Sequence, residues 1–272
     1  MIMFNFKKNT VFSRDNHFAE VTEDTATGGV LAVWGSPNSG KSTVAFKIAK
    51  YLADQKKNVI LLLCDMTAPM LPCAVPPSEL EIEKSLGSIL AATHVTEPLV
   101  KYNMVTLKKN PYLSIVGMLK GENEYTYAPY GKVQAEELID CLKEIAPFVV
   151  IDCSSYIAND ILSAVSINDA DNVLRLVNCD LKSISYLSSQ LPLLQNSGYD
   201  MEKHYKVASN VKPQHGVEQM AGALGSLAFT IPTSAEIEEQ YLSGNLLGEL
   251  SMKSSRGFRD TIKKITKEVF GV

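Results

Sequence analysis

The sequence predicts an α/β fold with a doubly wound, mainly parallel sheet, and two observations support this. Short apolar runs recur along the chain, and most are apolar on both alternating faces, as is typical of parallel strands covered by helices on both sides. Segments with helical spacing of apolar residues lie between these runs, which indicates strand–helix–strand units. About seven strands are expected: 29–35, 58–64, 113–118, 147–153, 172–178, 205–210 and 226–231.

Apolar periodicity also predicts the helices, one of which directly follows the first strand. In this helix Val44 and Ile48 fall on one face, together with neighbouring alanines. Two segments predict loops, because 65–78 contains four prolines and 119–130 is polar and aromatic. The predicted helices are 41–54, 131–145, 180–195, 234–242 and 254–270.

The bulk composition predicts a cytoplasmic globular protein. Hydrophobic residues make up 46% and charged residues 21% of the 272 residues, and the net charge of −4 excludes a generic nucleic-acid binder without a local basic patch. Five scattered cysteines without CxxC spacing indicate reduced thiols, and no apolar run reaches membrane-spanning length. Residues 1–28 lack clear periodicity and are predicted to be an N-terminal extension, which leaves 29–272 as the folded domain.

The turn after the first strand fits the phosphate-binding pattern GxxxxGK[ST]. Backbone N–H groups of such a turn point at an anion, and the following helix adds its positive end. The lysine can reach the outer phosphates of a nucleotide, and the hydroxyl after it can ligate Mg²⁺. The alternative is a glycine-rich turn that binds nothing, but the strand before it and the amphipathic helix after it favour phosphate binding. The residues are Gly35, Ser36, Pro37, Asn38, Ser39, Gly40, Lys41, Ser42 and Thr43.

Two carboxylates follow buried strands and are candidates for the same site. Asp152 ends the run 148–152 and Asp65 follows the run 59–64, so both are expected at the sheet edge where ligands bind. Asp152 could hold Mg²⁺ together with Ser42, and Asp65 could orient an attacking water. The alternative for each is an aspartate that caps its own loop.

These motifs, in this order, resemble the MinD/ParA group of P-loop ATPases, and most closely its pilus-associated CpaE/TadZ-like branch. The resemblance runs from about Val30 to the C-terminus. It is carried by the phosphate loop and by the segments FVVIDCSS (148–155), DADNVLRLVNCDLKSISYLSS (169–189), YKVASNVKP (205–213) and FTIPTSAEIEEQYLSGNLL (229–247).

The resemblance implies functions for individual residues and for the chain. It implies that 29–272 is a P-loop ATPase domain that binds ATP and Mg²⁺, with Asn210 and Pro232 at the adenine base. It also implies that Asp65 activates water and that Lys41 assists catalysis. The expected function is a switch that positions a pilus, secretion or partition assembly, with a nucleotide-linked homodimer and protein partners of that assembly.

The sequence departs from this family in places that bear on hydrolysis. Ser36 stands where the family has a lysine that reaches across the dimer, and Leu63 stands where an acidic residue is frequent. Residues 1–28 are too short for the receiver-like domain of the CpaE/TadZ branch. We therefore expect ATP binding with slow or weak hydrolysis. The alternative is a non-hydrolysing nucleotide-binding adaptor, and the sequence alone leaves both open.

Two further segments have alternative interpretations. Residues 253–268 form a basic amphipathic pattern, which we interpret as a helix that covers the sheet. Peripheral contact with a membrane, a cell pole or DNA through its basic face is the less favoured alternative. In the loop 119–130, exposed tyrosines could form a partner surface, and ordinary loop packing is equally consistent with the sequence.

Overall fold

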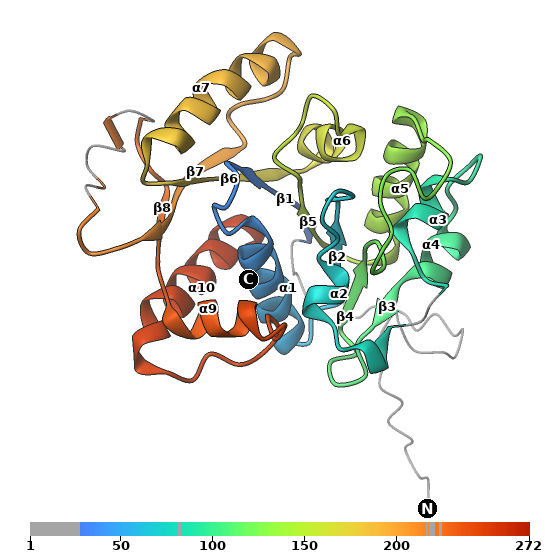
Figure 1. Ribbon diagram of the computed structural model, residues 1–272, viewed down its shortest axis with the longest axis horizontal. Helices are drawn as coiled ribbons and strands as arrows, with labels where there is room; N and C mark the ends of the chain where they lie inside the picture. The colour runs from blue at the N-terminus through green and yellow to red at the C-terminus, as the bar shows by residue number, and fades with distance from the viewer. Residues whose placement is uncertain (1–27, 81–82, 216, 218–220, 223–224) are drawn as a thin grey trace, which may run out of the picture.

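A computed structural model describes residues 28–80, 83–215, 217, 221–222 and 225–272 of the chain. The predicted extension over 1–28 therefore lies outside the described residues except for Gly28. The rest forms one sheet with helices on both faces (Figure 1).

The sheet contains eight strands in the order β3-β4-β2-β5-β1-β6-β7-β8. Every neighbouring pair is parallel except β3 and β4, so the predicted doubly wound, mainly parallel α/β fold is confirmed. The two-residue edge strand β3 was not predicted. The strands are β1 (Gly29–Gly35), β2 (Val59–Leu63), β3 (Val105–Thr106), β4 (Leu113–Val116), β5 (Phe148–Asp152), β6 (Asn172–Asn178), β7 (His204–Val211) and β8 (Phe229–Pro232).

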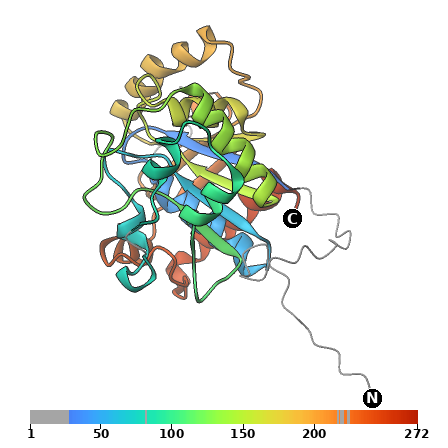
Figure 2. The same cartoon turned by 90° about the vertical axis from the view of Figure 1, so that its right-hand side faces the viewer.

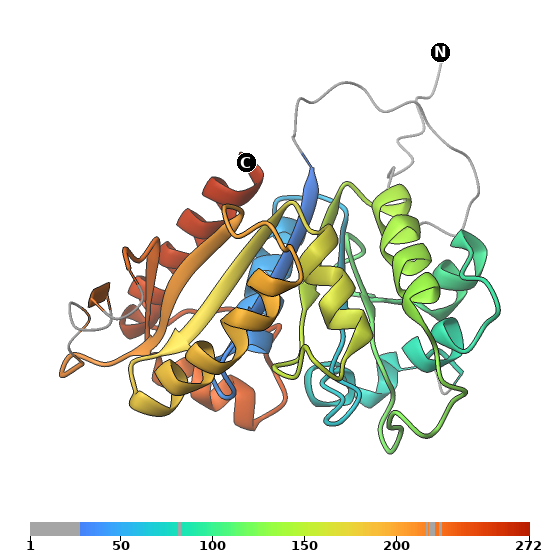
Figure 3. The ribbon, with the colours of Figure 1, turned by 90° about the horizontal axis from the view of Figure 1, so that it is seen from above.

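Helices α1 and α10 cover one face of the sheet, and α5, α6 and α7 cover the other (Figure 3). Short helices and loops between β2 and β4 lie at one end of the molecule (Figure 1), the end that faces the viewer in Figure 2. The helices are α1 (Lys41–Asp54), α2 (Leu71–Ala74), α3 (Leu86–Leu90), α4 (Glu97–Asn103), α5 (Lys132–Ile145), α6 (Ile161–Asp169), α7 (Leu181–Asn196), α9 (Ala235–Leu242) and α10 (Arg256–Phe270), with the 3₁₀ turns η1 (Pro77–Glu79) and η2 (Lys253–Ser255).

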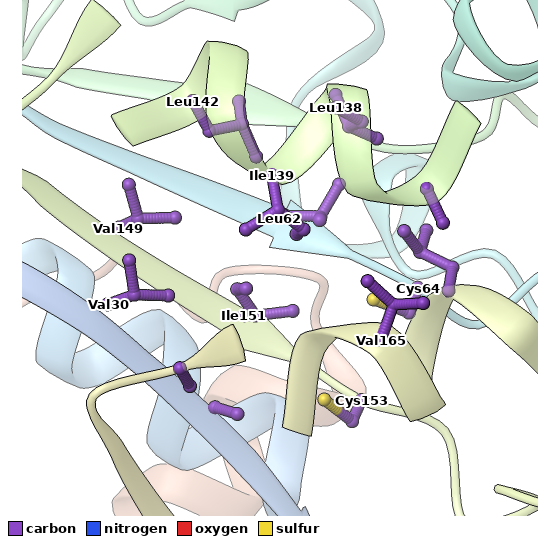
Figure 4. Close-up of a cluster of buried hydrophobic side chains, with 14 of the residues drawn as sticks. Val30, Leu62, Cys64, Leu138, Ile139, Leu142, Val149, Ile151, Cys153 and Val165 are labelled. Carbon is purple, nitrogen blue, oxygen red and sulfur yellow. The ribbon is translucent and has the colours of Figure 1, made fainter. Parts of the chain in front are cut away.

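Each face of the sheet has its own hydrophobic core. Figure 4 shows part of one core, where Leu138 and Ile139 of α5 lie over Leu62 of β2 and Val149 of β5. These side chains are fully or almost fully buried. Burial on both faces explains why strands such as β1, β2 and β5 are apolar on both alternating faces, and it fixes the strand ends that carry the polar site.

The structure corrects two expectations about the loops and helices. The segment 65–78 is not one long loop, because α2 and the start of η1 lie within it, and Leu71 of α2 is buried. The short helices α3 and α4 were not predicted, and neither was α6, whose sequence ILSAVSIND scatters two serines among its apolar residues and lacks a clear polar face. Its N-terminus is nevertheless defined, since the Asp160 side chain accepts a hydrogen bond from Ser163 N.

The C-terminal helix α10 covers the sheet, as the favoured interpretation expected. Phe258, Ile262 and Ile265 are buried against α1 and β8. The basic side chains of α10 are exposed, and contact with lipid or DNA through them stays the less favoured alternative. Among the described residues, no helix combines the length and the apolar character that crossing a bilayer requires.

Candidate functional site

The phosphate loop lies between β1 and α1, and its two glycines are required by the backbone geometry. A Cβ atom on Gly35 would lie 1.9 Å from the Leu176 carbonyl oxygen, so no side chain fits there. Gly40 precedes α1 with φ 79°, and Asn38 also has a positive φ of 60°. No side chain caps the N-terminus of α1, which leaves its first N–H groups available for an anion.

Lys41 extends from the start of α1 into the centre of this loop. Its Nζ donates to Ser155 Oγ at 2.7 Å and to the Ser36 carbonyl oxygen at 3.4 Å. Burial lowers the pKa of Lys41, and the nearby charges of Asp152 and Asp65 oppose that shift. The ammonium group is thus directed at the space that the loop encloses.

Asp152 ends β5 and is 3% exposed, so its carboxylate is almost completely buried. Burial raises its pKa to about 7, against a hydrogen bond from Ser42 and the charge of Lys41, which both lower it. Its Oδ1 has no hydrogen-bond partner among the described residues. An unpaired, buried carboxylate oxygen beside a hydroxyl group fits the oxygen ligands that Mg²⁺ prefers, so the residues present are suited to this ion.

Asp65 follows β2 and lines the same cleft. Its Oδ1 accepts hydrogen bonds from the backbone N–H groups of Thr67 and Ala68, each at 2.9 Å. Asp65 therefore caps its own loop, as the alternative interpretation of the sequence expected. The role in orienting water stays a prediction.

Asn210 lies at the end of β7 with φ 52° and supports the phosphate loop. Its Nδ2 donates to the Asn38 carbonyl oxygen at 3.2 Å and to Asn178 Oδ1 at 2.9 Å, and Asn178 Nδ2 also donates to the Asn38 carbonyl oxygen. Both N–H groups of Asn210 are thus directed to protein atoms. Pro232, at the end of β8, lies on the wall of the same cleft.

The cleft has a volume of about 1620 Å³, larger than the ~300–1000 Å³ of ordinary ligand pockets. It lies at the carboxyl ends of the strands, where ligands bind in open α/β sheets. Gly35, Ser36, Ser39 and Asp152 lie behind the cleft wall, and Ser36 and Ser39 are fully buried. The predicted residues that line it are Pro37, Asn38, Gly40, Lys41, Ser42, Thr43, Asp65, Asn210 and Pro232.

Three residues at the site were missed by sequence analysis: Ser155, Tyr186 and Asn178. Ser155 lies three residues after Asp152, and Asn178 ends β6. Their contacts join segments more than 30 residues apart in the chain. The only local signal for Ser155 and Asn178 was their position at or just after a strand end, which many residues share, and Tyr186 lies within α7, where nothing local marks it.

Comparison with known proteins places the fold among characterised structures. Neither a protein-family model nor a curated protein sequence matches the chain. Solved structures do match it, among them a ParA family ATPase from Chlorobium tepidum, with a TM-score of 0.73 and 14% identity over 88% of this chain and 98% of that one. The chain has the fold of the ParA and MinD ATPases.

Two other structures with the ParA/MinD fold contain nucleotides. MinD from Pyrococcus horikoshii in complex with Mg-ADP matches with a TM-score of 0.67 and 16% identity, over 89% of this chain and 95% of that one. The complex of a McdA point variant from Cyanothece with ATP matches with a TM-score of 0.63 and 20% identity, over 91% and 98%. The resemblance to the CpaE/TadZ branch within this fold stays a prediction.

Proposed function

We propose that the chain binds Mg-ATP at residues 35–43 and works as a nucleotide-controlled switch that positions a cellular assembly. One observation carries this proposal: Lys41, Ser42 and the unpaired oxygen of Asp152 converge at a glycine-shaped loop. This loop opens into a large cleft at the carboxyl edge of the sheet. The nucleotides in structures of the same fold support the proposal.

The residues divide the binding of Mg-ATP between them. The loop N–H groups and Lys41 bind the phosphates, and Ser42 and Asp152 hold Mg²⁺, which when bound neutralises phosphate charge. Asn210 and Pro232 lie beside the base. Both N–H groups of Asn210 are already used, so its Oδ1 is the atom left to accept a hydrogen bond from the adenine amino group.

Ser36 supports slow hydrolysis. Its side chain is fully buried, carries no charge and contacts Ser183 of α7 rather than the cleft. A cation supplied to the transition state is worth about 10³–10⁵ in rate in other P-loop systems, and Ser36 cannot supply it. A non-hydrolysing adaptor that holds ATP as a structural ligand is the second candidate, and the same observation favours it.

The rim of the cleft is suited to binding a protein, and a second copy of this chain is the first candidate partner. Tyr125, Tyr156 and Tyr241 line the cleft with exposed fractions of 88%, 71% and 54%. Aromatic side chains are enriched in protein interfaces, and the cleft is larger than one nucleotide needs. A nucleotide-linked homodimer acting on a pilus, secretion or partition assembly is consistent with this surface.

Calorimetry with Mg-ATP tests the binding function. We expect the wild-type chain to bind and the variant Lys41→Ala to lose most of its affinity, because phosphate charge is left uncompensated. Lys50→Ala is the matched control, since Lys50 lies on the same helix but pairs with Asp54 and Glu249 outside the cleft. Equal affinity in wild type and Lys41→Ala would contradict the proposal.

Turnover measured over a series of protein concentrations separates the switch from the adaptor. A slow rate that rises as dimers form supports the switch, and no turnover at any concentration supports the adaptor. A fast rate would show that another residue replaces the missing cation, and the proposal of slow hydrolysis would then be wrong.

A further inference from the structure

The Lys41 side chain is held by a serine from a different part of the chain. Ser155 follows β5, and its Oγ accepts a hydrogen bond from Lys41 Nζ at 2.7 Å. The same hydroxyl group donates to the Gly35 carbonyl oxygen at 3.0 Å. Ser155 thus connects the first residue of the phosphate loop to the ammonium group that follows the loop.

The two contacts of the ammonium group set its direction. A lysine has three N–H donors, and two of them are directed to Ser155 Oγ and the Ser36 carbonyl oxygen. The third is left for another acceptor. A long, flexible lysine side chain loses conformational entropy when it is ordered, and a side chain that is already held has less entropy left to lose on binding.

Ser155 is itself fixed by residues of α7 and α6. Its carbonyl oxygen accepts a hydrogen bond from the Tyr186 hydroxyl group at 2.5 Å. The preceding backbone N–H, that of Ser154, donates to Ser163 Oγ at 2.8 Å. Tyr186 in turn packs beside Trp34 of β1, with 6.0 Å between ring centroids. The position of Ser155 therefore depends on helices outside the phosphate loop.

Helix α7 contacts the phosphate loop and Ser155 through two polar residues on one face. Ser183 Oγ accepts from Ser36 Oγ at 3.1 Å, and Tyr186 lies three residues further along, on the same side of the helix. Besides Ser183, only Leu187 and Leu194 of α7 are fully buried. The N-terminal half of α7 is thus attached to the site by these hydrogen bonds and by the packing of Ile184, Tyr186 and Leu187 on the core.

We propose that Ser155 is a positioning residue that aims the Lys41 ammonium group at the outer phosphates, and that Tyr186 holds Ser155 in place. This inference rests on the proposed function, because it needs a nucleotide at the phosphate loop. Ser155 acts through Lys41, so it contributes to the binding of the phosphates and not of the base. A purely structural serine would contribute equally to every ligand of the cleft, through the stability of the loop.

The test compares variants by their affinity for Mg-ATP and for AMP, which lacks the outer phosphates. Calorimetry gives the Kd of Mg-ATP, and competition against a fluorescent ATP analogue gives that of AMP. Ser155→Ala should weaken Mg-ATP binding about tenfold, as for one hydrogen bond to a charged group, and leave AMP binding unchanged. In a Lys41→Ala background, Ser155→Ala should have no further effect, because Ser155 acts on the phosphates only through Lys41.

Tyr186→Phe tests the second part of the proposal and should weaken Mg-ATP binding in the same selective way, by about threefold. Two matched controls should bind Mg-ATP like the wild type. Ser189→Ala removes an exposed serine hydroxyl group of α7 that donates to the Ser185 carbonyl oxygen, away from the cleft. Tyr199→Phe removes a hydroxyl group that also donates to a backbone carbonyl oxygen, that of Ala164.

The outcomes separate this inference from the proposed function. If the wild-type chain binds no Mg-ATP, both are wrong. If the wild type binds and Ser155→Ala binds equally well, the inference alone is wrong. Equal losses of Mg-ATP and AMP affinity would show a structural role for Ser155 and also overturn the inference, and thermal melting of each variant identifies such a loss of structure.

Discussion

Two lysines of helix α1 differ in their surroundings, because Lys47 is bonded to other parts of the protein and Lys41 faces the cleft. Lys47 is 5% exposed and donates to Gln240 Oε1 at 2.6 Å and to the Gly248 carbonyl oxygen at 2.8 Å, which ties α1 to α9 and to the segment after it. Burial lowers its pKa to about 8. Lys41, less than two turns earlier, instead points into the cleft.

Two buried carboxylates also differ in whether protein groups satisfy their hydrogen bonds. Glu236 of α9 accepts hydrogen bonds from Ser251, Met252 and Ser255, which lower its pKa to about 2. Asp152 is also buried, yet one of its oxygens has no partner among the described residues and its pKa is raised to about 7. Buried polar groups are normally paired. The polar groups beneath α9 and α10 therefore serve the fold, and those at the phosphate loop are poised to bind a ligand.

The largest expected effect is a difference between the two carboxylates in how their contribution to stability depends on pH. The pKa of Asp152 is raised from 3.8 to about 7 in the folded protein. Its contribution to stability is therefore complete below pH 3.8 and is lost as the pH rises through 7, a change of up to about 4 kcal/mol. The pKa of Glu236 is lowered from 4.5 to about 2, so its contribution is present above pH 4.5 and is lost as the pH falls through 2.

Urea unfolding between pH 4.5 and 8, with a chelator present, measures this difference. We expect the wild type to lose stability relative to Asp152→Asn as the pH rises over this range, because the amide cannot ionise. His204, whose pKa burial lowers to about 4, changes the stability of both proteins alike and cancels in this difference. Glu236→Gln should lower the free energy of unfolding without changing its pH dependence over this range. An unchanged pH dependence in Asp152→Asn would show that Asp152 is paired in solution, and the contrast would fail.

The two lysines give the next largest effect. Lys41→Ala should weaken Mg-ATP binding about 100-fold and change the free energy of unfolding by less than about 1 kcal/mol. Lys47→Ala should do the reverse and cost about 2–3 kcal/mol of stability, because Gln240 and Gly248 lose their buried donor. Calorimetry measures the Mg-ATP affinity of both variants, and urea unfolding measures their free energies of unfolding. A single variant that loses both properties would contradict the division between the two regions.

The phosphate loop could be predicted from the sequence because its determinants are local. Gly35, Gly40, Lys41 and Ser42 are defined by spacing alone, and the apolar runs before and after them identify the strand and the helix. Asp152 was placed at the sheet edge by the same reasoning. The edge strand β3 was missed because two residues carry no periodicity.

The contacts that decide how the loop works could not be predicted, since they join distant segments. Ser155 reaches Lys41 across 114 residues of sequence, and Asn210 reaches Asn178 across 32. The side chain of Ser36 likewise has no local signal for its direction, which depends on the packing of α7. Spacing identifies the residues of a site, and packing decides which of their atoms remain free.

A smaller effect is expected at Glu236, whose carboxylate is hydrogen-bonded by other groups of the protein. Glu236→Ala removes the acceptor of the hydrogen bonds that join α9 to η2 and to the residues before it, and it should lower the melting temperature by roughly 5 °C. Mg-ATP affinity should stay unchanged. Glu239→Ala is the matched control, because Glu239 is exposed on the same helix. Equal melting temperatures for the two variants would show that the paired network adds little to stability.

The smallest effect is expected at Ser36, which lies in the phosphate loop but is paired like the groups beneath α9. Its side chain is fully buried and its Oγ bonds Ser183 Oγ at 3.1 Å. Ser36→Ala should therefore cost about 1 kcal/mol of stability and leave Mg-ATP affinity within about twofold of wild type. Ser36→Lys should be far more destabilising, because it places a cation beneath α7 and not in the cleft.

Urea unfolding and calorimetry on Ser36→Ala, Ser183→Ala and the double variant decide this last point. If the two hydroxyl groups pair only with each other, the double variant should lose less stability than the sum of the single variants, because neither group is left unsatisfied. A large loss of Mg-ATP affinity in Ser36→Ala would instead place Ser36 among the groups poised for the ligand. Ser36 would then bind the ligand like the other groups of the phosphate loop, and the groups that serve only the fold would lie outside the loop.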